Sequence, residues 1–103
     1  MLNAYDRGAL NSFGDNSIDY LVDDASHRLQ DHLYLIENYY SKLKEGGKII
    51  LEDVGYKQNT DICIPETEAA AYTFGYEYKL YDLRSEQTTD FSVIIELTKE
   101  RVQ

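Results

Sequence analysis

Short apolar runs along this chain alternate with longer segments in which apolar residues recur at a helical period. The first apolar run, Ile18 to Val22, is β-branched, aromatic or aliphatic except for Asp19, and polar residues bound it on both sides. This pattern predicts a strand that is buried on both faces. Met1 to Asn16 is polar and without a clear period, which predicts a loop with at most a short helical turn.

The segment from His27 to Lys44 has the clearest helical pattern. Its apolar residues are spaced by four, three, four and three positions, which places them on one stripe: Leu29, Leu33, Ile36, Tyr40 and Leu43. Ser26 is a suitable N-cap, and Gly46-Gly47 offers the positive φ at which many helices end. His32 lies off the face that carries His27, so we expect it at the surface.

The remainder of the chain predicts three more strands and one more helix. We expect a strand over Lys48 to Val54, a loop to Ile64, a helix from Pro65 to Phe74, and strands over Tyr76 to Leu83 and Phe91 to Thr98. The first three strands, which helices separate, should pair in parallel through right-handed crossovers, and the last two should form an antiparallel hairpin. The predicted fold class is α/β, in a single domain over residues 1–103.

Composition narrows the functional classes. A formal charge of −9 would repel a phosphate backbone, and no basic stripe offsets it, so we expect no nucleic-acid partner. No apolar run approaches the roughly 20 residues that span a bilayer, and the polar start does not resemble a signal peptide, so we expect no membrane partner and a cytoplasmic location. Cys63 is the only cysteine and is expected to be a small buried apolar residue.

Candidate chemistry lies where two predicted strands end. Asp23 and Asp24 follow the first strand, and Glu52 and Asp53 close the second. Ligand sites in open α/β sheets lie beyond the carboxyl ends of parallel strands, so neighbouring strands about 5 Å apart would bring four carboxylates together. Such a cluster is unfavourable without a cation, and oxygen ligands suit Mg²⁺, Mn²⁺ or Ca²⁺.

Two simpler interpretations of these acidic pairs remain open. Asp24 and Ser26 could merely cap the following helix, with His27 in solvent and Glu52-Asp53 at the start of a loop. The stretch Tyr20 to Asp24 also resembles the opening of response-regulator receiver domains, in which an Asp pair holds Mg²⁺. A receiver needs about three more parallel strands after its phosphoacceptor, whereas this chain ends in a predicted hairpin.

A longer set of ordered motifs resembles class I S-adenosylmethionine-dependent methyltransferases. These motifs are Ile18 to His27, ending in Asp-Asp-Ala-Ser-His, and Leu43 to Val54, which contains Gly-Gly and ends its strand in Glu-Asp. They are most similar to the metal-dependent O-methyltransferase and cephalosporin-hydroxylase-like branch, as is the pattern from Tyr81 to Leu97. Ala25 and Glu45 depart from the glycine and proline usual in that branch.

The resemblance implies roles for particular residues. Asp23 or Asp24, with Glu52 and Asp53, would bind a divalent cation that polarises an acceptor hydroxyl. His27 would be the general base, because an imidazole that titrates near neutrality can accept the hydroxyl proton as the methyl group is transferred. Asn3 and Ala4 would approach the adenine of S-adenosylmethionine, and Asp23 would also face this cofactor. The acceptor would be a small molecule.

The first half of such a domain has no counterpart in this sequence. Gly8 and Gly14 are isolated and form no Gly-x-Gly loop after an apolar strand. The resemblance therefore implies a partial Rossmann-like methyltransferase sheet that holds the fourth to seventh strands and lacks the first three. We expect an incomplete methyltransferase domain that is inactive by itself, or alternatively a non-catalytic, self-associating binding or assembly module. The exposed edge of Ile18 to Val22 predicts a homodimer.

Overall fold

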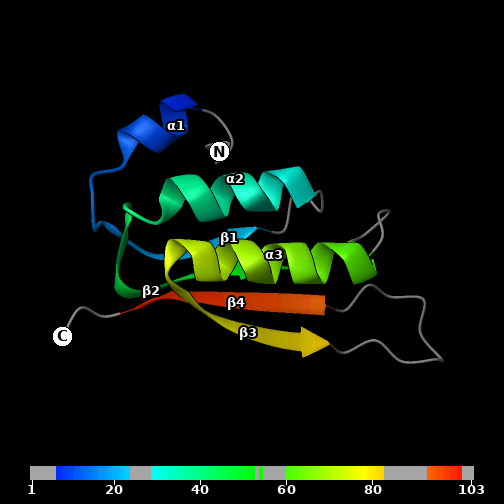
Figure 1. Ribbon diagram of the computed structural model, residues 1–103. Helices are drawn as coiled ribbons and strands as arrows, with labels where there is room; N and C mark the ends of the chain where they lie inside the picture. Colours follow the sequence, from blue (N-terminus) through cyan, green and yellow to red (C-terminus); the bar gives the residue numbers. More distant parts are fainter. Residues whose placement is uncertain (1–6, 24–28, 53, 55–59, 83–92, 101–103) are drawn as a thin grey trace.

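The computed structural model describes residues 7–23, 29–52, 54, 60–82 and 93–100 of the chain, and they form one mixed sheet with three helices. The elements are α1 (Arg7–Ser12), β1 (Ile18–Asp23), α2 (Leu29–Tyr39), β2 (Leu43–Leu51), α3 (Thr60–Phe74), β3 (Tyr76–Asp82) and β4 (Val93–Lys99). The strands lie in the order β1-β2-β4-β3 (Figure 1). No helix in these described ranges is long and apolar enough to cross a membrane.

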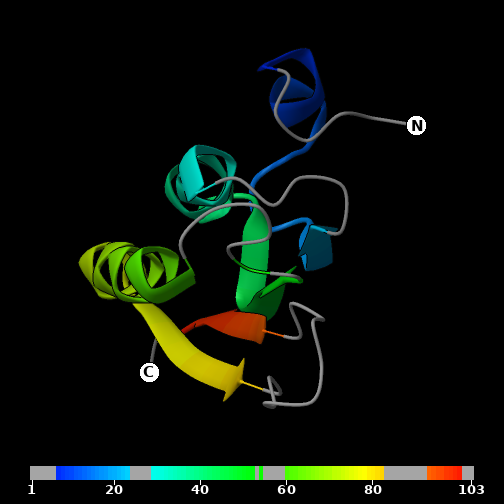
Figure 2. The same ribbon diagram turned by 90° about the vertical axis from the view of Figure 1, so that its right-hand side faces the viewer.

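Helices α2 and α3 lie side by side on one face of the sheet, and no described helix covers the other face (Figures 1 and 2). The core lies between these two layers, because alternate strand residues point toward the helices. In β4 these are Val93, Ile95, Leu97 and Lys99, all buried. Phe13, just after α1, packs edge-on against Tyr39 of α2 with ring centroids 6.3 Å apart. Cys63 is buried, as predicted.

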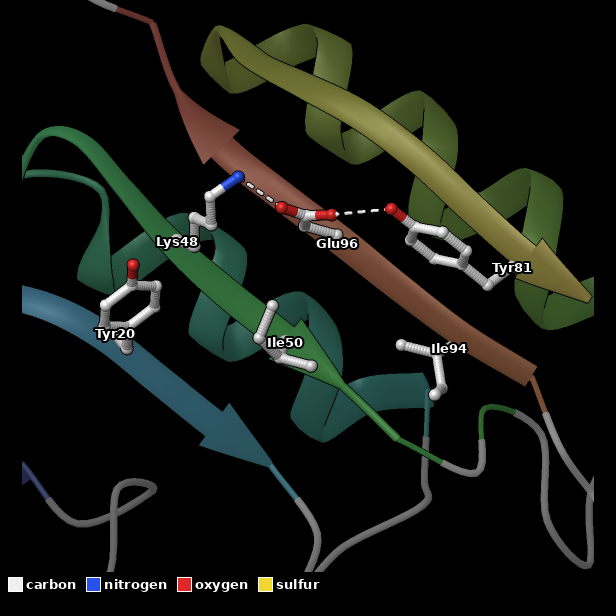
Figure 3. Close-up of a pocket in the computed structure, with 6 residues that line it drawn as sticks. All are labelled: Tyr20, Lys48, Ile50, Tyr81, Ile94 and Glu96. Atoms are coloured by element: carbon white, nitrogen blue, oxygen red, sulfur yellow. Dashed lines mark hydrogen bonds and ion pairs between the residues drawn. The ribbon is translucent and has the colours of Figure 1, made fainter.

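The expectation that the first strand is buried on both faces is wrong. Tyr20 and Val22 of β1 are 68% and 53% exposed. Tyr20 lines a groove on the sheet face away from the helices (Figure 3), and Val22, two residues further along the strand, shares that face. We call this face the open face; its central residues are Tyr20, Val22, Lys48, Ile50, Tyr81, Ile94 and Glu96. In a short apolar run the hydrophobic pattern does not show whether one or both faces of the strand are buried.

The parallel pairing of β1 with β2 is confirmed, with one irregularity in register. Ile18 lies opposite Leu43, but Tyr20 lies opposite Lys48, so β2 loops outward between these two pairs. Gly46 has φ 77° in this loop, and a Cβ on Gly47 would lie 2.9 Å from the main-chain oxygen of Ile18. The two glycines therefore shape a bulge within β2. The prediction that they end the preceding helix is wrong.

Helix α2 ends at Tyr39, earlier than predicted, and its buried face differs from the expected stripe. The buried residues are His32, Leu35, Ile36 and Tyr39. The expected surface position of His32 is therefore wrong. Leu43 begins β2, and because it is fully buried there, its apolar character fitted a helix and a strand equally well.

Helix α3 begins at Thr60, so Pro65 lies inside the helix and not in its first turn. Proline removes one i to i−4 hydrogen bond, here toward residue 61. The helix is retained because residues four positions apart pack onto the core: Cys63, Thr67 and Ala71. Gly75 follows the helix with φ 87°, which confirms the predicted end.

The predicted hairpin is confirmed, but its position in the sheet differs from the simplest parallel arrangement. β3 pairs antiparallel with β4 from Tyr76↔Lys99 to Asp82↔Val93, and β4 pairs antiparallel with β2. The third strand thus runs in the same direction as β1 and β2, but β4 lies between it and β2. The expected direct parallel pairing of the third strand is therefore wrong.

Candidate functional site

The carboxyl ends of β1 and β2 meet at one edge of the sheet. Asp23 is the register partner of Leu51, and Glu52, the next residue, is half-buried. The main-chain N–H of Val54 donates to the oxygen of Val93 at 3.1 Å, which fixes the segment after β2 against the start of β4. The backbone therefore brings together the two strand ends that carry the acidic pairs.

Most side chains of the predicted catalytic, metal and cofactor residues lie outside the described part of the chain. These are Asp24, His27 and Asp53, with Asn3 and Ala4, while only the main chain of Asp23 is described. Among the side chains that are described, no group of three His, Cys, Asp or Glu residues could hold a metal ion. The predicted ligand set stays a prediction, and the paired strand ends are the part of it that the structure supports.

These strand ends fit a divalent cation in their chemistry. Carboxylate oxygens are the donors that Mg²⁺ and Mn²⁺ prefer, and the sequence supplies four carboxylates at the two paired ends. The described glycines do not fit a cofactor loop, because none follows the end of a strand: Gly8 lies in α1, Gly14 precedes β1, Gly46 and Gly47 lie within β2, and Gly75 follows α3. The described residues therefore offer no glycine-rich turn after a strand to cradle S-adenosylmethionine.

A second candidate site is a groove of about 490 Å³ on the open face, which sequence reasoning missed. Side chains from all four strands line it: Tyr20, Lys48, Ile50, Tyr81, Ile94 and Glu96 (Figure 3). The two isoleucines form its floor, while the tyrosines flank it on either side. The groove residues of β1, β2 and β4 all have even numbers, as expected for side chains on one face of a strand. This pattern points to a shared face only when the register between the strands is known.

A small polar network lies along one side of this groove. Lys48 forms an ion pair with Glu96 and donates to the Thr98 hydroxyl at 3.1 Å. Tyr81 donates its hydroxyl proton to the other oxygen of Glu96, also at 3.1 Å. The hydrogen bond from Lys48 holds the pKa of Glu96 below its ordinary value, and the Tyr81 hydroxyl adds to this effect. Glu96 is therefore an anion with two donors fixed on it.

Comparison with known proteins gives matches among solved structures only. No protein-family model matches the chain, and no curated protein does. A fibrillarin pre-rRNA processing protein from Methanococcus jannaschii matches 97% of this chain with 18% identity and a TM-score of 0.61. A protein from Thermus thermophilus, proposed to be a DNA modification methylase, matches 94% with 11% identity and a TM-score of 0.60.

A third match, an S-adenosylmethionine-dependent methyltransferase from Methanosarcina mazei, covers 96% of this chain with 13% identity and a TM-score of 0.54. At these identities the likeness concerns the fold: the chain has a fold that resembles S-adenosylmethionine-dependent methyltransferases. The chain spans only 52% of the Thermus protein, 44% of the fibrillarin and 65% of the Methanosarcina enzyme. The chain is therefore about half to two thirds as long as the proteins whose structures it matches.

Proposed function

We propose that this chain is the carboxyl-terminal portion of an S-adenosylmethionine-dependent, divalent-metal-dependent O-methyltransferase. The observation that carries the proposal is the parallel pairing of β1 and β2, in which Asp23 lies opposite Leu51. Glu52 directly follows Leu51, so the ends of the two strands lie next to each other. The methyltransferase-like fold supports it independently. In this proposal Asp23, Asp24, Glu52 and Asp53 supply oxygen ligands to the cation.

The chemistry divides between these residues and His27. A bound cation supplies charge that stabilises the acceptor oxygen as it loses its proton. His27 takes up that proton, and a neutral imidazole is suited to this because its ordinary pKa lies close to physiological pH. In this proposal Asn3, Ala4 and Asp23 would contribute to cofactor binding in the complete domain.

The chain alone should bind S-adenosylmethionine weakly or not at all. None of the described glycines follows the carboxyl end of a parallel strand, and the chain spans only 44–65% of the matching structures. Isothermal titration of the purified chain with S-adenosylmethionine tests this point. Stoichiometric, saturable heat would contradict the proposed incompleteness.

Thermal unfolding with and without Mg²⁺ or Mn²⁺ tests the metal site. A cation at ten times its Kd stabilises a protein by about 1.4 kcal/mol, which raises Tm by about 6–11 °C in a domain of this size. We expect Glu52→Gln to abolish this increase. Glu77→Gln is the matched control, because Glu77 is exposed near the start of β3, at the opposite end of the sheet.

The alternative function, a non-catalytic binding or assembly module, gives the opposite result in the same experiment. The open face favours this alternative, since it exposes apolar side chains together with a groove. If neither cation raises Tm, and if Glu52→Gln and Glu77→Gln behave alike, the acidic strand ends are ordinary surface and the metal-dependent proposal fails.

A further inference from the structure

The chain that leads from β2 to Val54 contains one residue more than the strand beside it. Leu51, the last residue of β2, lies opposite Ile95 of β4. Beyond this pair, the N–H of Val54 donates to the main-chain oxygen of Val93 at 3.1 Å. In a regular antiparallel ladder the second residue after Leu51 would bond Val93, but Val54 is the third. One extra residue opposite a continuous partner is the arrangement of a β-bulge.

The extra residue returns the chain to the hydrophobic core. Side chains alternate between the two faces of a strand, so in a regular continuation of β2 the side chains of residues 51 and 54 would lie on opposite faces. Instead, Leu51 and Val54 are both fully buried and belong to the same core cluster. The acidic pair Glu52-Asp53 therefore lies, along the chain, between two buried apolar residues.

Both ends of this short segment are fixed to neighbouring strands. Leu51 is paired with Asp23 of β1 on one side and with Ile95 of β4 on the other. Val54 is held by Val93, which begins β4 and is also fully buried. The position of the second acidic pair relative to Asp23 thus depends on two anchors, and Val54 is the one that follows the acids.

Carboxylates that share a cation need such support. Like charges at close range repel one another, so the acids are driven apart when no cation is bound. Groups that hold metal ligands in place without binding the metal typically change the metal affinity about 10–100-fold when they are altered. An apolar residue that fixes the backbone beside the acids can therefore influence the metal affinity although it carries no ligand atom in its side chain.

We propose that Val54 is a positioning residue for the cation. Its buried side chain and its N–H hold the acidic pair after β2 against β4, beside the acids that follow β1. Val54 does not bind the cation itself. This inference rests on the proposed metal-dependent function, to which it adds a residue that the acidic motifs do not contain.

Mn²⁺ binding by variants tests the Val54 side chain. The electron paramagnetic resonance signal of free Mn²⁺ measures how much of the ion the protein binds. Val54→Ala should weaken Mn²⁺ binding about 10–100-fold. Ile49→Val is the matched control, because it also removes buried apolar volume from β2, at a residue that pairs with Leu21 and Leu97 and not with the acidic strand ends. This control should bind Mn²⁺ as the unmodified chain does.

Three outcomes of this titration would overturn the inference. Equal Mn²⁺ affinity in Val54→Ala and the unmodified chain would remove the role of Val54 and leave the metal site standing. Equal weakening in Val54→Ala and Ile49→Val would attribute the loss to a loosened core. If the unmodified chain binds no Mn²⁺, the proposed function fails and this inference fails with it.

Amide hydrogen exchange of the unmodified chain tests the Val54 N–H without a substitution, so it does not depend on whether Val54→Ala folds. If the cation binds only while the bond from Val54 to Val93 is closed, Mg²⁺ slows its opening by the factor 1 + [Mg²⁺]/Kd. At ten times Kd the exchange of this amide, followed by nuclear magnetic resonance, should slow about 11-fold. The control is the N–H of Gly75, which donates to Tyr72 at the end of α3 and should exchange at an unchanged rate. An unchanged Val54 rate, or equal slowing at Gly75, would overturn the inference.

Discussion

The hydroxyl of Tyr76 donates a hydrogen bond of 2.8 Å to the main-chain oxygen of Ile36. Ile36 lies in the last turn of α2, where carbonyl groups lack the helical N–H four residues ahead. One side chain at the start of β3 thus satisfies a buried acceptor at the end of a helix 40 residues earlier. The Tyr40 ring packs edge-on against Tyr76, with centroids 5.1 Å apart.

Replacing Tyr76 by phenylalanine should destabilise the protein. The variant keeps the ring but leaves the Ile36 oxygen buried without its donor, which costs about 1–3 kcal/mol in free energy of unfolding. Urea unfolding followed by circular dichroism measures this loss. Tyr72→Phe is the control, since Tyr72 is 62% exposed, and we expect a change within about 0.5 kcal/mol. Equal effects of the two variants would contradict the assigned role.

Gly47→Ala should destabilise the β2 bulge. The added Cβ would lie 2.8 Å from the oxygen of Lys44 and 2.9 Å from that of Ile18, and both obstacles are main-chain atoms. Such crowding costs about 1–3 kcal/mol. At Gly14 a Cβ meets nothing within 4 Å, so Gly14→Ala should leave the unfolding free energy nearly unchanged. If denaturant titrations gave equal stabilities for both variants, the close approach at Gly47 would be wrong.

Lys99 fixes the end of β4 to two other segments. Its ammonium donates to the oxygen of Leu43 at 3.0 Å and to the Asn16 side-chain oxygen at 3.3 Å, and lies 4.6 Å from the Tyr40 ring centroid. Lys99 is only 9% exposed, so Lys99→Met keeps the apolar stem but removes the donors from a buried carbonyl.

We expect Lys99→Met to lower the free energy of unfolding by about 1–3 kcal/mol. Each kcal/mol should lower Tm by about 4–8 °C. Differential scanning calorimetry measures this shift. Lys79→Met serves as the comparison, because Lys79 is exposed. Its ammonium lies over the Tyr81 ring, 5.1 Å from the ring centroid. A Tm decrease in Lys79→Met as large as in Lys99→Met would contradict the role of buried donors.

The Lys48–Glu96 ion pair predicts a pH-dependent contribution to stability. The folded state lowers the pKa of Glu96, so the contribution is present above the ordinary pKa of about 4.3 and is lost as pH falls through the lower folded value. At pH 7, Glu96→Gln should cost about 0.5–1 kcal/mol, since both partners are partly exposed.

Urea titrations of both proteins at several pH values test this dependence. The difference between the unmodified chain and Glu96→Gln should shrink as pH falls below about 4. A difference that stays constant across this range would mean that the carboxylate charge contributes nothing. Glu77→Gln, which changes an exposed acid outside this network, should show no comparable dependence.

Sequence patterns predicted the individual strands better than their arrangement. The runs at Ile18–Asp23 and Val93–Lys99 have apolar and β-branched character that is independent of their neighbours, and both form strands. The place of β4 between β2 and β3 depends on pairing between distant segments, which local periodicity does not encode. Helix ends were misjudged where a buried residue suited two structures, as at Leu43.

The candidate site divides in the same way. The expectation that two acidic pairs follow neighbouring parallel strands rested on topology, and the pairing of Asp23 with Leu51 confirms the neighbourhood of the strands. The groove could not be predicted, because its six residues come from four strands whose register is fixed only by tertiary pairing. His32 was misjudged because its place off the face that carries His27 was taken to mean exposure, whereas this position lies on the buried face of α2.

The central place of β4 has a consequence for synthesis of the chain. β4 is the last of the described strands, yet it pairs with β2 on one side and β3 on the other. Until residues 93–99 leave the ribosome, β3 has no partner within this sheet and one edge of β2 stays bare. During synthesis β3 and one edge of β2 therefore stay unpaired until β4 emerges. At this stage chaperones would protect the nascent chain from aggregation.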